Sequence, residues 1–489
     1  MTSKRPTAPN IILIVSDDQG PWALGAAGNT EIRTPVIDAL AADGVRLSRF
    51  FCASPVCSPA RASLLTARVP SQHGVHDYLD GAHAGTESTD YLAGMPTFTE
   101  ALADAGYRLG LSGKWHLGAS DVPRRGFVHW FALHGGGSSY DRAVMYRDGR
   151  AESVEGYLTD IITDDAISFI DDEAAGDSPF FLAVNFTAPH KPFAGQHPDE
   201  YTAMYRHCAF ESCPQESPHP WLQTLDGGPI GGEPDAREAL IGYFAAVTAM
   251  DAAIGRILES VRAHGIEGET VIVFTSDNGF NAGHHGIWGK GNGTFPINMY
   301  DESVMVPFVV TAPGRVPPGR VSDALVSAYD FAPTLLDLVG LDPAPFEGGP
   351  GRSRADLLRA VDDDRRGAEP RDVVVHNEYG PVRMIRSAER KYVHRYPFGP
   401  HEFYDLELDP RERCNLIDDT ERRDEIAVMR RRLVEWFDAH VHDAGRDGSR
   451  LPVAGAGQLA PLGDDPYDVF GAPAWDGAGA HDGARDGGA

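Results

Sequence analysis

The stretch Asn10-Ile11-Ile12-Leu13-Ile14-Val15-Ser16-Asp17-Asp18, near the start of the chain, changes abruptly from apolar to polar residues. The apolar run Asn10–Val15 has the length and the β-branched composition of a buried β-strand. Ser16-Asp17-Asp18-Gln19 then interrupts the apolar pattern with carboxylates. The stretch therefore predicts a strand that ends in a polar loop.

The same arrangement recurs along the chain. Further β-rich runs, each followed by a loop of unusual composition, occupy Tyr107–Leu111, Phe180–Phe186, Thr270–Thr275 and Val306–Thr311. Helical patterns lie between the runs, at Thr97–Ala105, Thr159–Asp171 and Glu238–His264. The alternation indicates an α/β fold with a large, mostly parallel central sheet flanked by helices. Because ligands bind beyond the carboxyl ends of strands in such sheets, we expect all five loops to gather there.

The composition changes after about residue 341. Pro, Gly and charged residues become dense over Leu341–Arg371, as at a domain boundary. Beyond it we expect short strands at Val373–Glu378, Val382–Ile385 and Lys391–Tyr396, and an amphipathic helix at Glu421–His440. The sequence thus predicts a large α/β domain over 9–360 and a smaller α+β subdomain of antiparallel strands and one helix over 372–442. Gly, Ala and Asp dominate residues 443–489, which we expect to form a mostly disordered tail.

The chain is strongly acidic. Its 489 residues include 71 Asp and Glu against 43 Lys and Arg, for a formal net charge of −28. A field of this sign argues against nucleic acids or anionic membranes as partners. An anionic substrate would need positive charge concentrated locally, from a metal or from converging Lys, Arg and His side chains.

Apolar segments and cysteines suggest the compartment. No apolar run approaches the roughly 18–20 residues of a membrane helix. The first, Ile11–Val15, is too short for the core of a signal peptide, so we expect a cytoplasmic protein. The cysteines are Cys52, Cys57, Cys208, Cys213 and Cys414, and such an odd, sparse set makes no disulfide framework.

Cys57 stands at the predicted start of a helix. Pro59 suits a first helical turn, and Ala60–Ala67 are good helix formers. Cys57 would then lie where backbone amides and the helix dipole favour an anion, with Arg61 one turn further on. A lone cysteine of this kind is often merely structural. Cys-x-Pro-x-Arg, however, is the signal by which formylglycine-generating systems select a cysteine.

The stretch from Cys57 to Arg68 resembles the signature of type I, formylglycine-dependent sulfatases of the alkaline-phosphatase-like superfamily. Ala60 replaces the usual Ser and Ala67 the usual Gly, but the core of the modification signal is kept. The resemblance spans about Pro9 to His440. It implies an alkaline-phosphatase-like fold, conversion of Cys57 to formylglycine, and a formylglycine-generating or sulfatase-maturating enzyme as partner.

Two loops carry oxygen ligands. Asp17-Asp18 would repel each other unless a cation joined them, and Asp277-Asn278 presents the same chemistry after another strand. A helix cap or an Asx turn is the alternative explanation for Asp17-Asp18 taken alone. The resemblance assigns these four residues, with position 57, to one divalent ion that is usually Ca²⁺.

Basic residues follow other strands. Lys114 and His116 match a second family signature, in which the lysine holds sulfate and the histidine hydrogen-bonds the formylglycine hydrate. His190 matches the histidine near the leaving-group oxygen, and Lys290 a second sulfate-binding lysine. Each alone could be a surface lysine or a core histidine. The roles of His284 and His285 stay open, and the segment Glu402–Pro410 matches a packing element of the family's C-terminal subdomain.

The resemblance implies a sulfuric ester hydrolase, arylsulfatase-like, that cleaves a sulfated small molecule or carbohydrate into an alcohol or phenol and inorganic sulfate. One hydroxyl of the formylglycine hydrate would attack sulfur, giving a covalent sulfo-enzyme, while Lys114, Lys290 and Arg61 stabilise the sulfuryl group. His190 would protonate the leaving oxygen, and the second hydroxyl, assisted by His116, would expel sulfate. The alternatives are a phosphodiester or phosphonate monoester hydrolase of the same superfamily and an inactive sulfatase-like binding protein.

Overall fold

The computed structural model of the chain describes residues 8–79, 89–225, 227–361, 371–377, 381–441, 449, 457 and 458. The expected boundary over 362–370, the end of the expected strand at 378, and most of the expected tail over 443–489 lie outside these residues.

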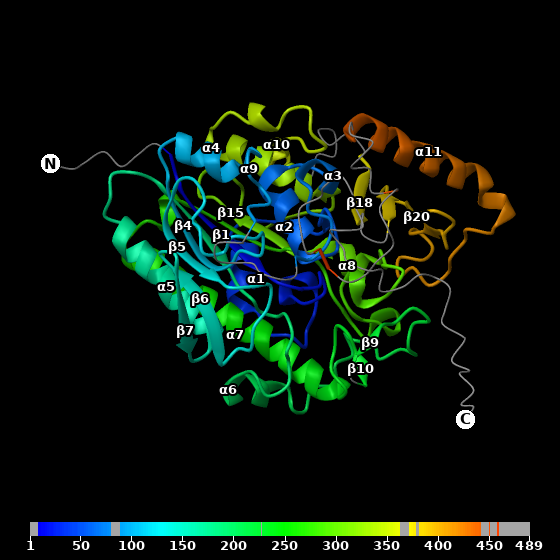
Figure 1. Cartoon of the computed structure of the whole chain (residues 1–489), viewed down its shortest axis with the longest axis horizontal. Coiled ribbons are helices and arrows are strands. Elements are labelled where there is room, and N and C mark those ends of the chain that lie inside the picture. Colours follow the sequence, from blue (N-terminus) through cyan, green and yellow to red (C-terminus); the bar gives the residue numbers. More distant parts are fainter. Residues whose placement is uncertain are drawn as a thin grey trace, which may run out of the picture.

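A ten-stranded sheet runs through the centre of the molecule in the order β16-β2-β15-β11-β1-β8-β4-β5-β6-β7 (Figure 1). Its strands are β1 (Asn10–Ser16), β2 (Val45–Leu47), β4 (Arg108–Lys114), β5 (Phe127–Leu133), β6 (Arg142–Arg147), β7 (Arg150–Glu155), β8 (Phe180–Asn185), β11 (Thr270–Ser276), β15 (Phe308–Thr311) and β16 (Arg320–Ser322). Four of the five strands expected from the sequence, β1, β4, β8 and β11, are adjacent and parallel to one another.

One strand on each side of the parallel centre reverses direction. β15 runs antiparallel to β11, and β6 runs antiparallel to β5, whereas β2 and β7 point the same way as the centre because they pair antiparallel with β15 and β6. The sheet is therefore mixed, with a parallel centre. The expectation for the loop after β15 was wrong: because β15 is antiparallel to β11, residues 312–314 leave at the opposite edge from the loops that follow β1 and β11. Strand direction depends on pairing between distant segments, which a local apolar run does not encode.

Helices cover both faces of the sheet (Figure 1). One face packs against α1 (Pro35–Ala42), α5 (Leu158–Glu173) and α7 (Ala236–Ala263), and the other against α2 (Cys57–Thr66), α4 (Phe98–Asp104) and α9 (Phe331–Val339). Short elements complete the large unit: α3 (Pro70–His73), α6 (Asp199–Thr202), α8 (Asp301–Val304), α10 (Ala355–Arg359), β3 (Phe50–Phe51), β9 (Thr224–Leu225), β10 (Gly228–Pro229), β12 (Asn281–Ala282), β13 (Trp288–Gly289), β14 (Met305–Val306) and β17 (Val326–Ser327).

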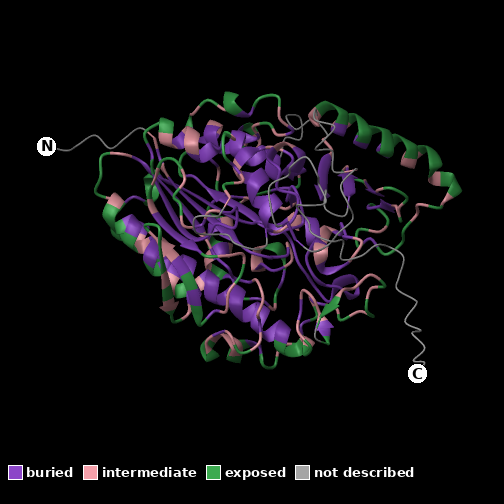
Figure 2. Ribbon diagram, in the orientation of Figure 1, coloured by how far each residue is buried: buried purple, intermediate pink, exposed green. Residues whose placement is uncertain are grey.

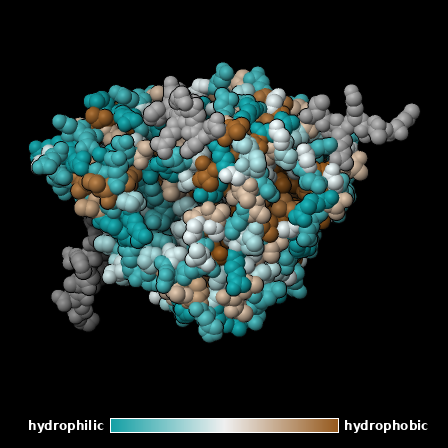
Figure 3. Space-filling view, turned by 180° about the vertical axis from the view of Figure 1, so that it is seen from behind, coloured by the Kyte–Doolittle hydropathy of each residue, from teal (hydrophilic) through white to brown (hydrophobic). Residues whose placement is uncertain are grey.

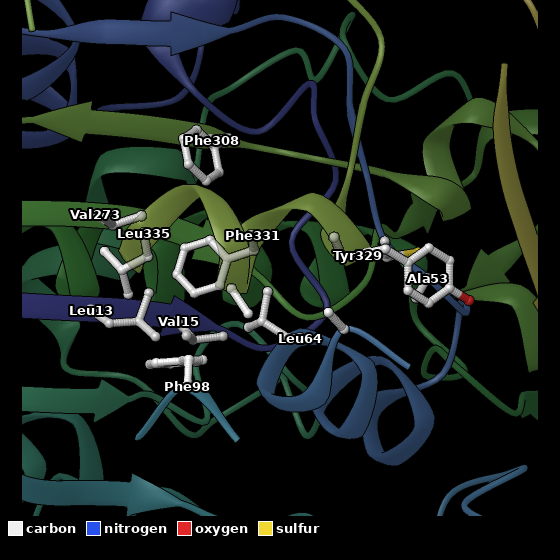
Figure 4. Packing of buried hydrophobic residues seen from close by; sticks show 14 of the residues in the cluster. Leu13, Val15, Ala53, Leu64, Phe98, Val273, Phe308, Tyr329, Phe331 and Leu335 are labelled. Atoms are coloured by element: carbon white, nitrogen blue, oxygen red, sulfur yellow. The ribbon is translucent and has the colours of Figure 1, made fainter. Parts of the chain in front are cut away.

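The alternation of side chains along β1 explains why both faces need cover. Leu13 and Val15 belong to one hydrophobic cluster, and Ile12 and Ile14 belong to the other. Figure 4 shows Leu13 and Val15 packed near Phe98, Phe331 and Leu335. Burying one such side chain stabilises the fold by about 1.5–3 kcal/mol. The strand that carries Asp17 and Asp18 is thus held from both sides.

Helix α7 differs from the expectation that no segment resembles a membrane span. Its length and composition would allow it to cross a membrane, because an 18-residue stretch of the helix has a mean hydropathy of 1.4. However, 83% of that stretch is buried inside the protein. Its residues Ala246, Met250 and Ile254 pack in the core beneath the sheet. Buried core helices of soluble proteins commonly have the same length and hydropathy, so α7 is weak evidence for a membrane span.

The C-terminal region forms the small unit that the sequence predicts. A four-stranded antiparallel sheet contains β18 (Val373–Asn377), β19 (Val382–Arg386), β20 (Arg390–Arg395) and β21 (Glu402–Asp405). Helix α11 (Arg423–His440) packs on it through Met429, Leu433 and Phe437, and its outer face is exposed (Figure 2).

This small unit is joined to the large one by buried charges. Lys391 of β20 is fully buried and pairs with Asp301 at 2.6 Å and with Glu412 at 2.5 Å.

The face of the molecule shown in Figure 3 is mostly hydrophilic with scattered apolar spots, in keeping with the high net charge.

Candidate active site

The parallel centre of the sheet brings the predicted site residues together. Asp17 and Asp18 follow β1, and Asp277 follows β11, whose Ser276 is paired with Ser16. Lys114 ends β4, and His190 lies beyond the end of β8. Because these strands run in one direction, their carboxyl ends share one edge of the sheet.

Helix α2 begins at Cys57, as predicted, and is buried along nearly its whole length. The helix ends at Ala67, whose φ of 50° is left-handed and favours the glycine usual at this position in the family. The Cβ of Ala67 costs about 1–2 kcal/mol there, and burial of its methyl group, worth about 0.8 kcal/mol, offsets only part of this cost.

The thiol of Cys57 lies among charged groups. It donates to Oδ1 of Asp17 at 3.5 Å, and Lys114 places its ammonium 2.5 Å from the other oxygen of Asp17. Burial raises the pKa of the Cys57 thiol to about 12, although the two lysines Lys114 and Lys290 oppose the shift. At neutral pH the unmodified side chain is therefore a thiol and a poor nucleophile.

Asp18 lies at the centre of a second set of contacts. Its Oδ1 accepts hydrogen bonds from Lys290 and from the side-chain amide of Asn278, each at 2.7 Å. Lys290 also lies 2.7 Å from Sγ of Cys57. Burial alone would raise the pKa of Asp18, but Lys290 and His190 hold it below its usual value. The φ of Asp18 is 63°, a left-handed conformation that is uncommon for residues other than glycine.

Asp277 is held by Arg61. The Nε of Arg61 donates to Oδ2 of Asp277 at 2.9 Å, and Nη1 donates to the carbonyl of Lys114 at 3.2 Å. Oδ1 of Asp277 accepts the backbone N–H of Asp18 at 3.3 Å. Among the described residues, Nη2 of Arg61 has no hydrogen-bond partner although it is buried. A buried donor is thus left unsatisfied beside Asp277.

The oxygen-rich group fits a metal ion. Ligand atoms of Asp17, Asp18 and Cys57 all lie within 4.8 Å of one another. Oδ1 of Asn278 is buried and, within the described part of the chain, without a hydrogen-bond partner. Burial and the neighbouring Asp277 raise the pKa of Asp17 to about 7. An orphaned amide oxygen and a carboxyl that resists ionisation are both relieved by a hard cation.

Two histidines line the space above Cys57. Nε2 of His116 lies 3.2 Å from the carbonyl of Leu79, and His116 has a left-handed φ of 56°. Nδ1 of His190 lies 2.7 Å from the carbonyl of Lys191, and its Nε2 is 3.7 Å from Asp18. Burial lowers the pKa of His190 to about 4, and Asp18 only partly offsets this.

Residues that the motifs do not mark support these histidines. A Cβ at Gly136 would lie 2.3 Å from the His116 ring, and one at Gly137 would lie 3.2 Å from His190. The hydroxyl of Tyr140 donates to the backbone carbonyl of His190 at 2.8 Å. The sequence His134-Gly135-Gly136-Gly137 signals a close backbone approach, but which side chain approaches it depends on the fold.

A cavity of about 490 Å³ opens over Cys57. Asp18, His116, His190 and Lys290 line its floor, and Tyr78, Leu79, His134, Lys191, Ile230 and Asn292 are among the residues of its wall. His284 and His285 are not among its lining residues; they hydrogen-bond to the Ser212 carbonyl and to Glu302.

Comparison with known proteins identifies the family. Residues 9–341 match the family model described as Sulfatase, and residues 283–438 match the model described as N-sulphoglucosamine sulphohydrolase, C-terminal. The chain belongs to the sulfatase family. It is a sulfuric ester hydrolase, which confirms the assignment made from Cys57–Arg68.

Individual sulfatases match over most of the chain. An ulvan-active sulfatase of Formosa agariphila is 31% identical over 435 residues, covering 84% of this chain and 78% of the relative. An N-acetylglucosamine-6-O-sulfatase of Bacteroides thetaiotaomicron is 28% identical over 485 residues, covering 84% and 82%. A structure solved with its substrate D-glucosamine-2-N,6-O-disulfate has a TM-score of 0.76 and 24% identity, covering 90% of this chain and 99% of that one. This last likeness shows the fold alone.

Proposed function

We propose that this sulfatase removes sulfate from a sulfated carbohydrate, with formylglycine at position 57 as nucleophile and one Ca²⁺ ion beside it. The observation that carries the proposal is the convergence of Asp17, Asp18 and Lys290 on Cys57 at the floor of a cavity. In a protein with a net charge of −28, this places two buried lysines and an arginine where an anion would bind.

The state of the Cys57 thiol supports its modification. A buried thiol with a pKa near 12 offers almost no thiolate at neutral pH. Formylglycine, as a hydrate, supplies one hydroxyl to attack sulfur and a second to expel sulfate. A cysteine or serine would lack that second hydroxyl and would stay sulfated.

The metal would be held by Asp17, Asp18, Asp277, Asn278 and residue 57. When bound, it would neutralise the carboxylates and withdraw electron density from oxygens of the sulfate and of residue 57. Oxygen donors of this kind suit Ca²⁺. The contacts of Asp17 with Lys114 and of Asp18 with Lys290 keep both lysines close to the same point.

The cationic side chains would bind the sulfate group. The ammonium of Lys290 contacts Sγ of Cys57, and that of Lys114 contacts Asp17. Nη2 of Arg61 is a third buried donor, without a hydrogen-bond partner among the described residues. Charge that develops on the sulfuryl oxygens during transfer is stabilised by such fixed donors, which act most strongly in a buried site.

His190 would give a proton to the leaving oxygen. The Lys191 carbonyl can only accept a hydrogen bond, so Nδ1 of His190 carries a hydrogen, and Nε2 faces the cavity floor near Asp18. An anionic substrate beside the ring raises its pKa from the low value that burial imposes. Protonation of Nε2 then provides the general acid.

The cavity wall supports a carbohydrate as the rest of the substrate. Its volume of about 490 Å³ lies in the usual range for small-molecule sites. His134, Lys191 and Asn292 offer polar groups to hydroxyls, and Tyr78 offers an aromatic surface. The two relatives described above are named for ulvan and for N-acetylglucosamine 6-O-sulfate.

The proposal is tested on the chain produced with and without a formylglycine-generating enzyme. The mass of the peptide containing residue 57 measures conversion, and turnover is followed with sulfated mono- and disaccharides, an aryl sulfate and a matched aryl phosphodiester. We expect activity proportional to conversion and highest for a sulfated sugar. Cys57→Ala should be inactive, whereas Cys414→Ala, which changes an exposed thiol, should be fully active.

Full turnover by the unconverted thiol would refute the role of formylglycine. Higher efficiency on the phosphodiester than on every sulfate would favour the phosphodiesterase alternative.

A further inference from the structure

Gly457 and Gln458, which follow α11 in the chain, lie near the centre of the molecule, where they form the short red segment in Figure 1. Gln458 is fully buried, although the surrounding composition predicts a disordered tail. Its backbone N–H donates to the carbonyl of Tyr78 at 2.8 Å, and it forms a parallel bridge with Leu79. Gln458 thus pairs with a segment nearly 380 positions earlier in the chain.

The side chain of Gln458 makes two further bonds to this segment. Its Oε1 accepts the backbone N–H of His76 at 2.8 Å, and its Nε2 donates to the carbonyl of Gly74 at 2.9 Å. The amide therefore satisfies one donor and one acceptor of a backbone that has no regular partner strand. Removing it would leave both groups unsatisfied, at about 1–3 kcal/mol each.

The opposite side of the same segment forms part of the active site. Tyr78 and Leu79 line the cavity. The backbone N–H of Leu79 donates to the hydroxyl of Ser58, the residue after the nucleophile, at 3.1 Å. The carbonyl of Leu79 lies 3.2 Å from Nε2 of His116. Leu79 therefore connects Gln458 to helix α2, which begins at Cys57, and to His116.

The hydrogen bond between the Leu79 carbonyl and His116 selects one tautomer of the neutral imidazole ring. A carbonyl can only accept, so Nε2 of His116 must carry the hydrogen. In the neutral imidazole, Nδ1 is then the nitrogen able to take up a proton. A shift of Leu79 would release this constraint and let the ring turn or change tautomer.

We propose that Gln458 is a positioning residue for catalysis: by holding residues 74–79 in place, it keeps the Leu79 carbonyl on His116 and so maintains that histidine as a proton acceptor. The role given to His116, assistance in expelling sulfate from residue 57, rests on the proposed function. Gln458 itself touches neither substrate nor nucleophile, and its effect passes through Leu79.

The test uses full-length protein carrying Gln458→Met, which fills the same space without hydrogen bonds, together with Gln458→Ala. Two truncations are matched to them: one after residue 442, which removes Gln458, and one after residue 462, which keeps it. Each is produced with the modifying enzyme, its conversion at position 57 is measured, and rates are expressed per converted site.

The readout separates the two chemical steps. With an aryl sulfate, the initial burst of phenol reports transfer to residue 57, and the steady rate includes release of sulfate. We expect Gln458→Met and the truncation after 442 to lower the steady rate by about 10-fold to 100-fold, with a clear burst and KM changed less than kcat. The truncation after 462 should match the parent.

Unchanged kcat and burst in Gln458→Met and in the truncation after 442, even with a lower melting temperature, would overturn the proposal and leave Gln458 a purely structural residue. If Gln458→Ala does not fold, the methionine variant decides. Activity of the parent per converted site tests the proposed function separately, so the two failures are distinguishable.

Discussion

The ammonium nitrogen of Lys290 lies 2.7 Å from Sγ of Cys57. The same nitrogen lies 2.7 Å from Asp18, so one lysine contacts both the proposed nucleophile and a candidate metal ligand. Burial alone would lower the pKa of Lys290, but Asp18 and the surrounding negative groups raise it well above its usual value. The side chain is therefore charged at neutral pH.

Replacing Lys290 should separate charge from shape. Lys290→Met removes the cation while keeping the length of the side chain, and we expect kcat to fall by about 10²–10³ because a fixed donor to the sulfuryl group is lost. Steady-state rates per converted site measure this. Lys290→Arg keeps the charge and should lose less. Equal losses in the two variants would contradict an electrostatic role.

Calcium should stabilise the protein more at high pH than at low pH. The pKa of Asp17 is raised to about 7, so without metal the folded protein takes up a proton there as the pH falls below about 7, while the unfolded chain does so only near 4. Protons therefore compete with the cation, because bound Ca²⁺ needs the ionised carboxylate.

We expect the rise in melting temperature on adding Ca²⁺ to be larger at pH 8 than at pH 5.5, as measured by calorimetry. Asp17→Asn, which cannot titrate, should show a smaller rise with less pH dependence. A rise of equal size at both values of pH would show that Asp17 does not control metal binding.

A methyl group at Gly136 should impair the reaction without unfolding the protein. The added Cβ would meet the ring of His116 at 2.3 Å, and the ring must move to admit it. Displacing a catalytic group by about 1 Å can cost 10²-fold in rate, so we expect Gly136→Ala to lower kcat by at least about 10-fold. Gly268→Ala, where a Cβ meets nothing within 4 Å, is the control and should be unaffected.

Removing Arg61 should destabilise the fold as well as the reaction. In protein freed of metal by a chelator, Arg61→Met leaves the buried carboxylate of Asp277 without its partner Arg61, and breaking such a buried pair typically costs about 3–5 kcal/mol. Urea unfolding at 25 °C measures the change in the free energy of unfolding. Arg125→Met breaks a pair with Asp104 that is 61% exposed on both sides and should cost less than about 1 kcal/mol. Similar losses for the two variants would argue against burial as the cause.

The strands and the floor of the site are readable from the sequence because both follow local rules. The apolar runs of β1, β4, β8 and β11 are long enough to identify as strands, and parallel strands must share a carboxyl edge. The positions of Asp17, Asp18 and Asp277 directly after such strands are therefore enough to predict that the three carboxylates lie together. The start of α2 at Cys57 was equally predictable, from Pro59 and the helix formers after it.

What the sequence could not show depends on contacts between distant segments. The reversal of β15 is decided by its pairing with β11 and β2. The approach of Gly136 to His116 depends on where two loops meet. Gln458 stands in a Gly- and Ala-rich stretch without periodicity. Its buried side-chain amide bonds to the backbone of Gly74 and His76, which lie far away in the sequence.

The two faces of β1 are packed into separate hydrophobic clusters, whereas the rim of the cavity comes from short connections such as those around Tyr78, His134 and Ile230. The sulfate ester that the enzyme accepts can therefore change through substitutions in loops, while the candidate site residues that follow β1 stay anchored to the rigid interior. An engineer seeking a new preference should graft rim segments from other members of the family and leave the strands untouched.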